Sequence, residues 1–201
     1  MFPIHVHVDN LSAETSVLVT NTEQLFSWHE YGLSLHIPEN SLPDNLHQCS
    51  IHIKASIMGD YQLPQDTHLV SAVYWMECVP KCQFSEPLTL EVQHCAKPET
   101  ISKLCFVKSN FKEAKAIFRA VDSTFDQCVF PYNTSYGFIE LNGFSGYGVA
   151  QKGSKERDYR ASVYYCEENP KSHQIHFVIT WNTNAHRKVH VCGSLHDTLQ
   201  D

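Results

Sequence analysis

Strict alternation of apolar and polar residues is the feature that most constrains the fold of this chain. Leu33, Leu35 and Ile37 alternate with polar side chains, and the same pattern recurs along residues 51–57. Successive side chains of a β-strand point to opposite faces, so this spacing predicts half-buried strands and fits a helix poorly. Prolines stand between the runs, where a missing N–H does least harm to a sheet. We therefore predict a sheet protein.

Further strand-like runs follow at regular spacing. Residues 69–79 are almost continuously apolar, which predicts one central strand covered on both faces. In residues 111–121 helix propensity conflicts with the strand pattern, and we expect a loop entering a strand. Short strands with turn signals between them favour an all-β, antiparallel β-sandwich. The other expected strands are 4–8, 16–20, 24–29, 88–95, 128–130, 136–141, 144–150, 160–166, 174–181 and 188–192.

Composition limits the classes of function. The chain has 201 residues and a formal net charge of −7, which argues against nucleic-acid binding because that needs a basic surface. No apolar run approaches the ~20 residues needed to span a bilayer, so we expect no membrane insertion. The first residues show neither a basic leader nor a hydrophobic signal core. We expect a cytoplasmic protein whose eight cysteines are reduced.

Residues 151–157 contain no apolar side chain and are a plausible linker. This stretch marks the boundary between the sandwich domain and the C-terminal part of the chain. We predict an N-terminal β lead-in at 1–21, a β-sandwich domain at 22–151, and a linker with a short C-terminal β segment at 152–201.

Several motifs resemble the ZU-5 domain family of zonula occludens proteins, Unc-5-like netrin receptors and ankyrins. These motifs are Gly-Leu-Ser-Leu-His-Ile-Pro at 32–38, Leu-Val-Ser-Ala-Val-Tyr at 69–74, Pro-Leu-Thr-Leu at 87–90 and His-Cys at 94–95. The resemblance implies a β-sandwich over residues 22–151. In several members a UPA domain follows, and residues 160–192 resemble the beginning of one.

The resemblance also implies a function. Members of the family act inside cells as scaffolds and dock onto other domains, including UPA and death domains of the same chain. We expect a non-enzymatic protein-interaction module in signal-transduction or cytoskeletal assemblies, with a protein domain as its partner. We assign no catalytic or cofactor-binding residue and expect no cofactor.

Self-processing is the alternative function. Some family members cut themselves at a His-Phe-Ser motif, where the Ser hydroxyl attacks the preceding carbonyl with help from the His. The matching stretch here is Gly143-Phe144-Ser145, which keeps the nucleophile, Ser145, but replaces the His by Gly143. Glycine cannot act as a base, so self-processing is disfavoured. The simpler interpretation is that Phe144 packs in the core and Ser145 lies in a strand.

A zinc-bound structural domain is a third hypothesis, with Cys78, Cys82, His94 and Cys95 as the candidate ligands. These residue types bind zinc when they converge at ~2.0–2.3 Å from one ion. Adjacent residues of a strand point to opposite faces, which opposes convergence of His94 with Cys95. The paired Cys-x-x-Cys spacing of common zinc sites is also absent. We therefore expect no metal site among these four residues.

Overall fold

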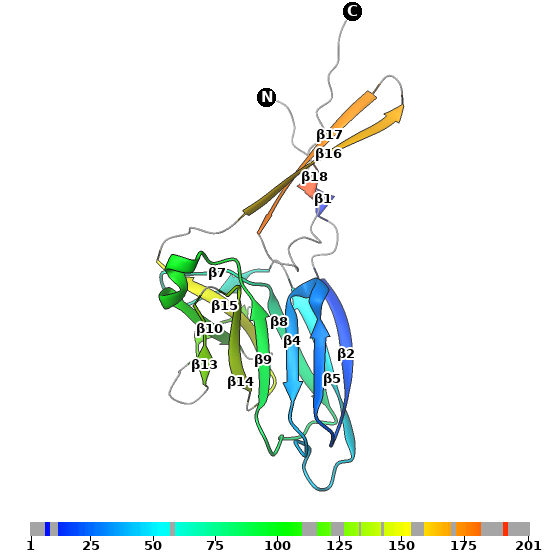
Figure 1. Cartoon of the computed structure of the whole chain (residues 1–201), viewed down its shortest axis with the longest axis vertical. Coiled ribbons are helices and arrows are strands. Elements are labelled where there is room, and N and C mark those ends of the chain that lie inside the picture. The colour runs from blue at the N-terminus through cyan, green and yellow to red at the C-terminus, as the bar shows by residue number, and fades with distance from the viewer. Residues whose placement is uncertain are drawn as a thin grey trace, which may run out of the picture.

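Two antiparallel sheets packed face to face form the main body of the protein (Figure 1). The structure, a computed structural model, describes residues 7–8, 12–56, 59–109, 116–121, 127–132, 134–141, 143–153, 159–169, 172–181 and 191–192. The predicted all-β sandwich is confirmed.

The larger sheet has the strand order β12-β10-β15-β8-β5-β2, and β7 also pairs with β15. Its strands are β2 (Ser12–Thr20), β5 (Gln48–Ser56), β7 (Thr67–Leu69), β8 (Val73–Val79), β10 (Leu104–Ser109), β12 (Arg119–Ala120) and β15 (Gly146–Lys152). The smaller sheet has the order β13-β14-β9-β4-β3. Its strands are β3 (Gln24–Trp28), β4 (Leu33–Ile37), β9 (Leu88–Gln93), β13 (Cys128–Val129) and β14 (Tyr136–Leu141).

Shorter elements surround the two sheets. The 3₁₀ helix η1 (His29–Tyr31) joins β3 to β4, and η2 (Pro98–Lys103) precedes β10. A short parallel pair joins β6 (Tyr61–Gln62) to β11 (Ala116–Ile117). Two antiparallel pairs complete the described chain: β16 (Tyr159–Asn169) with β17 (Ser172–Trp181), and β1 (His7–Val8) with β18 (Val191–Cys192).

The alternating residues fill the space between the sheets. Leu33, Leu35 and Ile37 of β4 are at most 1% exposed, as are Ile51 and Ile53 of β5. Both strands contribute to the larger of two hydrophobic clusters, and the smaller one includes Leu69, Val107 and Ala150 of the larger sheet. The period-two pattern therefore assigned the inward faces of these strands correctly.

The predicted central strand at 69–79 is divided, and in this respect the prediction was wrong. Ser71 lies between β7 and β8, and its hydroxyl accepts a hydrogen bond from the N–H of Val149 at 2.8 Å. The same hydroxyl donates to the carbonyl of Ala72 at 2.7 Å. A side-chain hydrogen bond here takes the place of a backbone one, so the chain bends while β7 and β8 both remain paired with β15.

Residues that we placed in the lead-in form an edge of the larger sheet. β2 pairs with β5 from Ser12 opposite Ser56 to Thr20 opposite Gln48. Val17 and Val19 of β2 are buried in the core. The lead-in prediction rested on local pattern, whereas this pairing joins segments that are distant in the sequence.

The remaining expectations are tested in part. Ala116–Ile117 and Arg119–Ala120 are short strands, which agrees with a strand at the end of the 111–121 region, while residues 110–115 lie outside the described residues. The helix η2 was not predicted. The UPA-like interpretation of residues 152–201 stays a prediction.

Candidate functional site

The Gly143-Phe144-Ser145 segment leads directly into β15. Ser145 is only 2% exposed, and its hydroxyl donates a hydrogen bond to the carbonyl of Ser109. The ring of Phe144 packs edge-on against Phe84, with ring centroids 5.4 Å apart, at the border of the hydrophobic core. Both residues therefore make structural contacts, but the simpler interpretation is only partly right: Phe144 packs at the border of the core, and Ser145 lies just before β15 rather than within a strand.

Gly143 occupies an open position in this segment. A Cβ atom added there would have no heavy atom within 4 Å. The carbonyl of Gly143 accepts a hydrogen bond from the hydroxyl of Tyr147 at 2.7 Å. The segment therefore has room for a side chain at position 143 but carries no group there that could take a proton from Ser145.

The four zinc candidates separate into two places. Cys78 and Cys82 lie together, with their Sγ atoms 3.6 Å apart, and the third thiol of their cluster is that of Cys49. Within the described residues this is the one group of three or more potential metal ligands, and it includes neither His94 nor Cys95. Sequence reasoning missed Cys49 because most of β5, the strands β6 and β7, and most of β8 separate it from Cys78 in the sequence.

Burial determines the protonation state of the thiols in this cluster. Cys49 is 2% exposed and Cys78 is 3% exposed, while Cys82 is partly exposed. Burial raises the pKa of Cys78 and of Cys82 to about 11, and it also raises the pKa of Cys49. All three side chains are therefore neutral thiols near pH 7 in the metal-free protein.

His94 is buried on its own, away from the thiol cluster. Its side chain is 1% exposed and packs against Phe130, with ring centroids 6.1 Å apart. Among the described residues neither ring nitrogen has a hydrogen-bond partner. Burial lowers the pKa of His94 to about 4, so the imidazole is neutral at physiological pH.

An open pocket of about 590 Å³ lies beside β10 and β15. It combines two lysines, Lys103 and Lys152, with the thiol of Cys105, whose pKa is raised by burial. The pocket residues include no carboxylate and no histidine, so the pocket does not bring together a paired acid and base. Its lining residues are Pro64, Gln65, Thr67, Ser102, Lys103, Leu104, Cys105, Ala120, Lys152 and Gly153.

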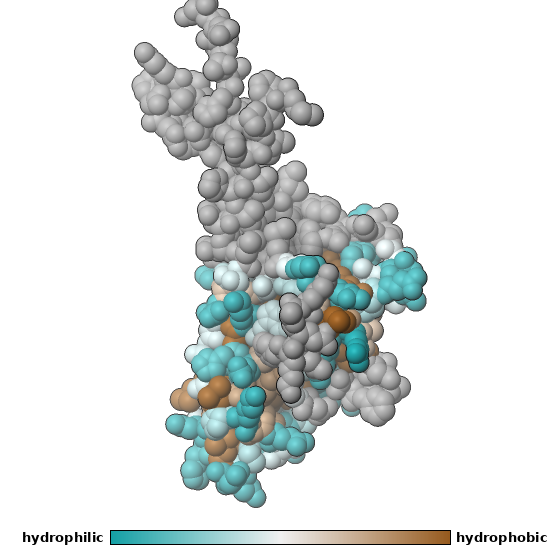
Figure 2. Space-filling model, turned by 180° about the vertical axis from the view of Figure 1, so that it is seen from behind, coloured by the Kyte–Doolittle hydropathy of each residue, from teal (hydrophilic) through white to brown (hydrophobic). Residues whose placement is uncertain are grey.

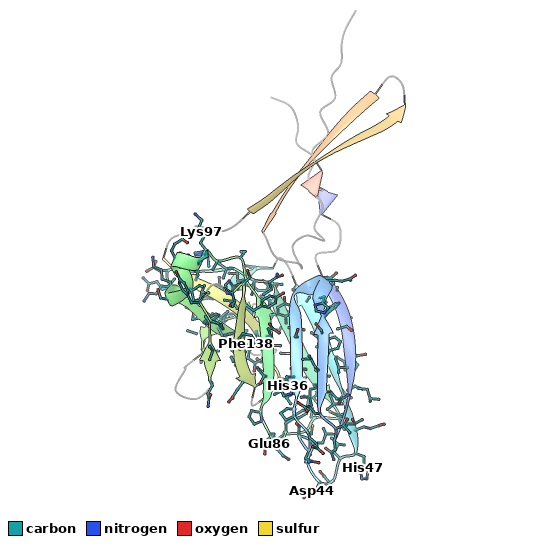
Figure 3. All side chains as sticks on the ribbon, in the orientation of Figure 1. His36, Asp44, His47, Glu86, Lys97 and Phe138 are labelled. Atoms are coloured by element: carbon teal, nitrogen blue, oxygen red, sulfur yellow. The ribbon has the colours of Figure 1, made fainter. Side chains whose placement is uncertain are left out.

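Two half-exposed aliphatic side chains lie on the outer face of the larger sheet. Leu18 of β2 and Val79 of β8 are 55% and 50% exposed, and both are paired in register with Ser50 of β5, which lies between them. We call Leu18, Ser50 and Val79 the apolar row. It lies near the end of the sandwich where Figure 3 labels Asp44 and His47, and Figure 2 shows hydrophobic residues exposed toward that end.

The side chain of Gln24 covers part of the neighbouring sheet edge. Its amide nitrogen donates to the carbonyl of Leu18 at 3.1 Å, and its amide oxygen accepts from the N–H of Thr20 at 2.9 Å. Among the described strands β2 pairs only with β5, so these two bonds replace a missing strand at one end of β2. Such cover protects an edge from unspecific pairing and leaves the adjacent sheet face open.

Residues 15–110 match the sequence pattern of the ZU5 domain family. This segment is a ZU5 domain. The match extends from β2 through β10, and it confirms the resemblance that the motifs at 32–38, 69–74, 87–90 and 94–95 carry. The ZU5 family is a protein-interaction type of domain.

Two further findings complete the description of the chain. No curated protein matches it significantly. Among the described residues, no helix has both the length and the apolar character that crossing a bilayer requires.

Proposed function

We propose that this chain is a non-enzymatic protein-interaction module of the ZU5 type, which docks onto another protein domain in signalling or cytoskeletal assemblies. The observation that carries the proposal is the ZU5 match over residues 15–110, which includes all of β5 and β8 and the part of β2 that bears Leu18. The docked domain lies in the same chain or in a partner protein.

The outer face of β2, β5 and β8 supplies the docking surface. Leu18 and Val79 provide aliphatic contact area near one end of this face. The next row of the same face consists of Ser16, His52 and Glu77, which are all exposed. Apolar contact area bordered by polar groups is common at protein–protein interfaces. The occupant that fits is a folded domain with an apolar patch of its own.

The contacts of Ser145 support a role without catalysis. Its hydroxyl donates to the carbonyl of Ser109, and Gly143 offers no base in the preceding turn. Self-processing needs both a free nucleophile and a proton acceptor. The open pocket near Cys105 also lacks a paired acid and base.

A cytoplasmic location fits the state of the cysteines. None of the six cysteines in the part of the chain with described side chains forms a disulfide, and two of them, Cys78 and Cys82, are close neighbours. Thiols so close together stay reduced in the cytosol and are prone to oxidation outside it. Asn10 and Asn133 each begin an Asn-x-Ser sequence, the acceptor for glycans in the secretory pathway. Intact-mass measurement of the chain expressed in animal cells tests the location: the mass of the unglycosylated, reduced polypeptide is expected, and glycans at either asparagine would contradict it.

The docking surface is tested by introducing positive charge into its apolar row. The double variant Leu18→Lys with Val79→Lys places two cations in the apolar row, and Val129→Lys is the matched control, because Val129 is 56% exposed on β13 of the other sheet. Partners of the full chain are identified by proximity labelling and then purified for binding measurements. We expect the double variant to bind at least about tenfold more weakly, as at an interface hot spot, and the control to bind like the wild type.

Two results would overturn this assignment. Equal affinity of the wild type and the double variant for every purified partner would remove the apolar row from the interface. Loss of binding in the Val129→Lys control alone would place the interface on the smaller sheet instead.

A further inference from the structure

Three thiols meet at one end of the sandwich. The Sγ atoms of Cys49, Cys78 and Cys82 all lie within 4.8 Å of one another. Those of Cys78 and Cys82 are 3.6 Å apart, and the Cys78 thiol also donates to the carbonyl of Pro80 at 3.3 Å. The three residues come from two strands and the loop after them.

The register of the larger sheet produces this meeting. Cys78 of β8 is paired with Ile51 of β5, and Cys49 precedes Ile51 by two residues, so both thiols point to the inner face. Beyond Val79 the chain leaves the strand and returns Cys82 to the same place. Two ligands therefore stand on a rigid sheet and the third on a loop.

The spacing of the sulfurs suits a shared metal ion. Three sulfurs bound at ~2.3 Å in a trigonal arrangement lie ~4.0 Å from one another. The Sγ atoms of Cys78 and Cys82 are 3.6 Å apart, and no pair in the cluster is more than 4.8 Å apart. Each separation would therefore have to change by less than an ångström to reach the value for a bound ion. A disulfide requires ~2.05 Å between two of the sulfurs and leaves the third without a partner.

We propose that Cys49, Cys78 and Cys82 form a three-thiolate binding site for a soft metal ion, with Zn²⁺ as the first candidate. Thiolate sulfur is the ligand that Zn²⁺ and Cu⁺ share. Binding of one Zn²⁺ releases three thiol protons to the solvent and leaves a site of net charge −1, whereas Cu⁺ on three thiolates leaves −2. The smaller residual charge is the less costly one to hold inside the hydrophobic cluster that contains these residues.

The fourth position of a tetrahedral zinc ion would face the side of Cys82. Cys49 and Cys78 are buried in the core, whereas Cys82 is partly exposed, so solvent reaches the cluster from the loop. A water molecule can complete the coordination there, as it does in zinc sites with three protein ligands. The alternative hypothesis is that the three thiols pack as small hydrophobic groups and bind no metal.

The experiment uses the full chain, stripped of metal and kept reduced without oxygen. Zn²⁺ and Cu⁺ are titrated separately against a coloured chelator that competes for each ion, and Co²⁺ is added in a third series to report thiolate ligation by its charge-transfer absorption. We expect one ion per chain and a cobalt spectrum with sulfur ligands. Stoichiometric binding of Zn²⁺ supports zinc as the occupant, and binding of Cu⁺ without any binding of Zn²⁺ overturns that choice.

Cys82→Ser is the decisive variant, because this loop residue can change without opening a cavity in the sheet. Loss of one of three ligands should weaken metal binding by at least about 100-fold, more than the loss of an outer-shell partner does. Cys105→Ser is the matched control, since Cys105 lies outside the cluster and donates its thiol hydrogen to the carbonyl of Ala150. It should bind metal like the wild type.

Three outcomes would overturn the site. These are the absence of stoichiometric binding of either ion by the wild type, equal affinity of wild type and Cys82→Ser, and equal losses in Cys82→Ser and Cys105→Ser. Circular dichroism of each variant verifies that it is folded. Should Cys82→Ser unfold, the cobalt charge-transfer intensity of the wild type, which scales with the number of thiolate ligands, decides between three ligands and fewer.

Discussion

The indole ring of Trp75 occupies the space that a side chain at Gly146 would need. The two residues face each other across the pairing of β8 with β15. A Cβ atom on Gly146 would lie 2.4 Å from Cζ3 and 2.5 Å from Cε3 of Trp75. The ring also packs against Phe118, with centroids 5.7 Å apart, which limits how far it can move away. Gly146 is therefore required by packing rather than by a special backbone conformation.

Gly146→Ala should destabilise the protein. The added methyl group overlaps the Trp75 ring, and overpacking of this kind costs about 1–3 kcal/mol of unfolding free energy. Urea denaturation followed by tryptophan fluorescence measures the change. Gly143→Ala is the control, because its Cβ would meet no atom within 4 Å, and we expect a change within about 0.5 kcal/mol. Similar values for the two variants would contradict the packing argument.

Ser71→Ala should be destabilising through a lost hydrogen bond. The hydroxyl of Ser71, which is 1% exposed, accepts the buried N–H of Val149 at 2.8 Å. Alanine leaves that N–H without its acceptor, which costs about 1–3 kcal/mol. Hydrogen exchange of the Val149 amide and urea denaturation both measure the effect. Ser16→Ala, on the exposed face of β2, serves as control and should leave the stability unchanged.

Stability should fall in mild acid because of His94. The pKa of His94 is about 4 in the folded protein and near 6.5 in the unfolded chain. Below pH 6.5 the His94 imidazole of the unfolded chain binds a proton, whereas that of the folded protein does not. The free energy of unfolding therefore keeps its full value above pH 6.5 and declines from there down to pH 4. Over that interval the loss from this residue is about 3 kcal/mol. Urea denaturation in steps from pH 7 to pH 4 measures it.

His94→Leu separates this effect from the titration of other groups. Leucine has no titratable group and leaves no unpaired ring nitrogen. The decline in unfolding free energy between pH 6.5 and pH 4 should therefore be smaller by about the same 3 kcal/mol. His52→Gln, which changes an exposed histidine of β5, should retain the decline of the wild type. An unchanged slope in His94→Leu would show that the buried imidazole is not its source.

The chain should remain uncut at the Phe144–Ser145 bond, and Gly143→His should introduce slow cleavage there. The open space around Gly143 admits an imidazole beside Ser145, and general base catalysis contributes about 10²–10⁴-fold to such reactions. Gel electrophoresis and intact-mass spectrometry after incubation at physiological temperature detect the fragments. The double variant Gly143→His with Ser145→Ala should stay intact. Fragments from the wild type would contradict the expectation that self-processing is disfavoured, and an uncut Gly143→His would contradict the expected gain of cleavage.

Local pattern was sufficient for part of this structure. The alternation of Leu33, Leu35 and Ile37 is a property of five consecutive residues, and it predicted both the strand and the face that is buried. The family motifs are likewise short segments, and they identified the ZU5 domain before any pairing of strands was known. Pro38, Pro80 and Gly153 directly follow the ends of β4, β8 and β15.

Other features depend on register between segments that lie far apart in the sequence. The apolar run at 69–79 gave no sign that the Ser71 hydroxyl would bond to Val149 and divide the strand. Likewise, only the pairing of β5 with β8 brings Cys49 to Cys78, and it separates them from His94 and Cys95.

By itself, the sequence determined that this chain forms strands, which faces of those strands are apolar, and to which family residues 15–110 belong. Tertiary structure decided that β2 joins the larger sheet, that Leu18 and Val79 flank Ser50 on an open face, and which three thiols meet. The physical reason is that side-chain periodicity along a strand is local. Contact between strands instead depends on how hydrogen-bond register and core packing are satisfied together across the whole chain.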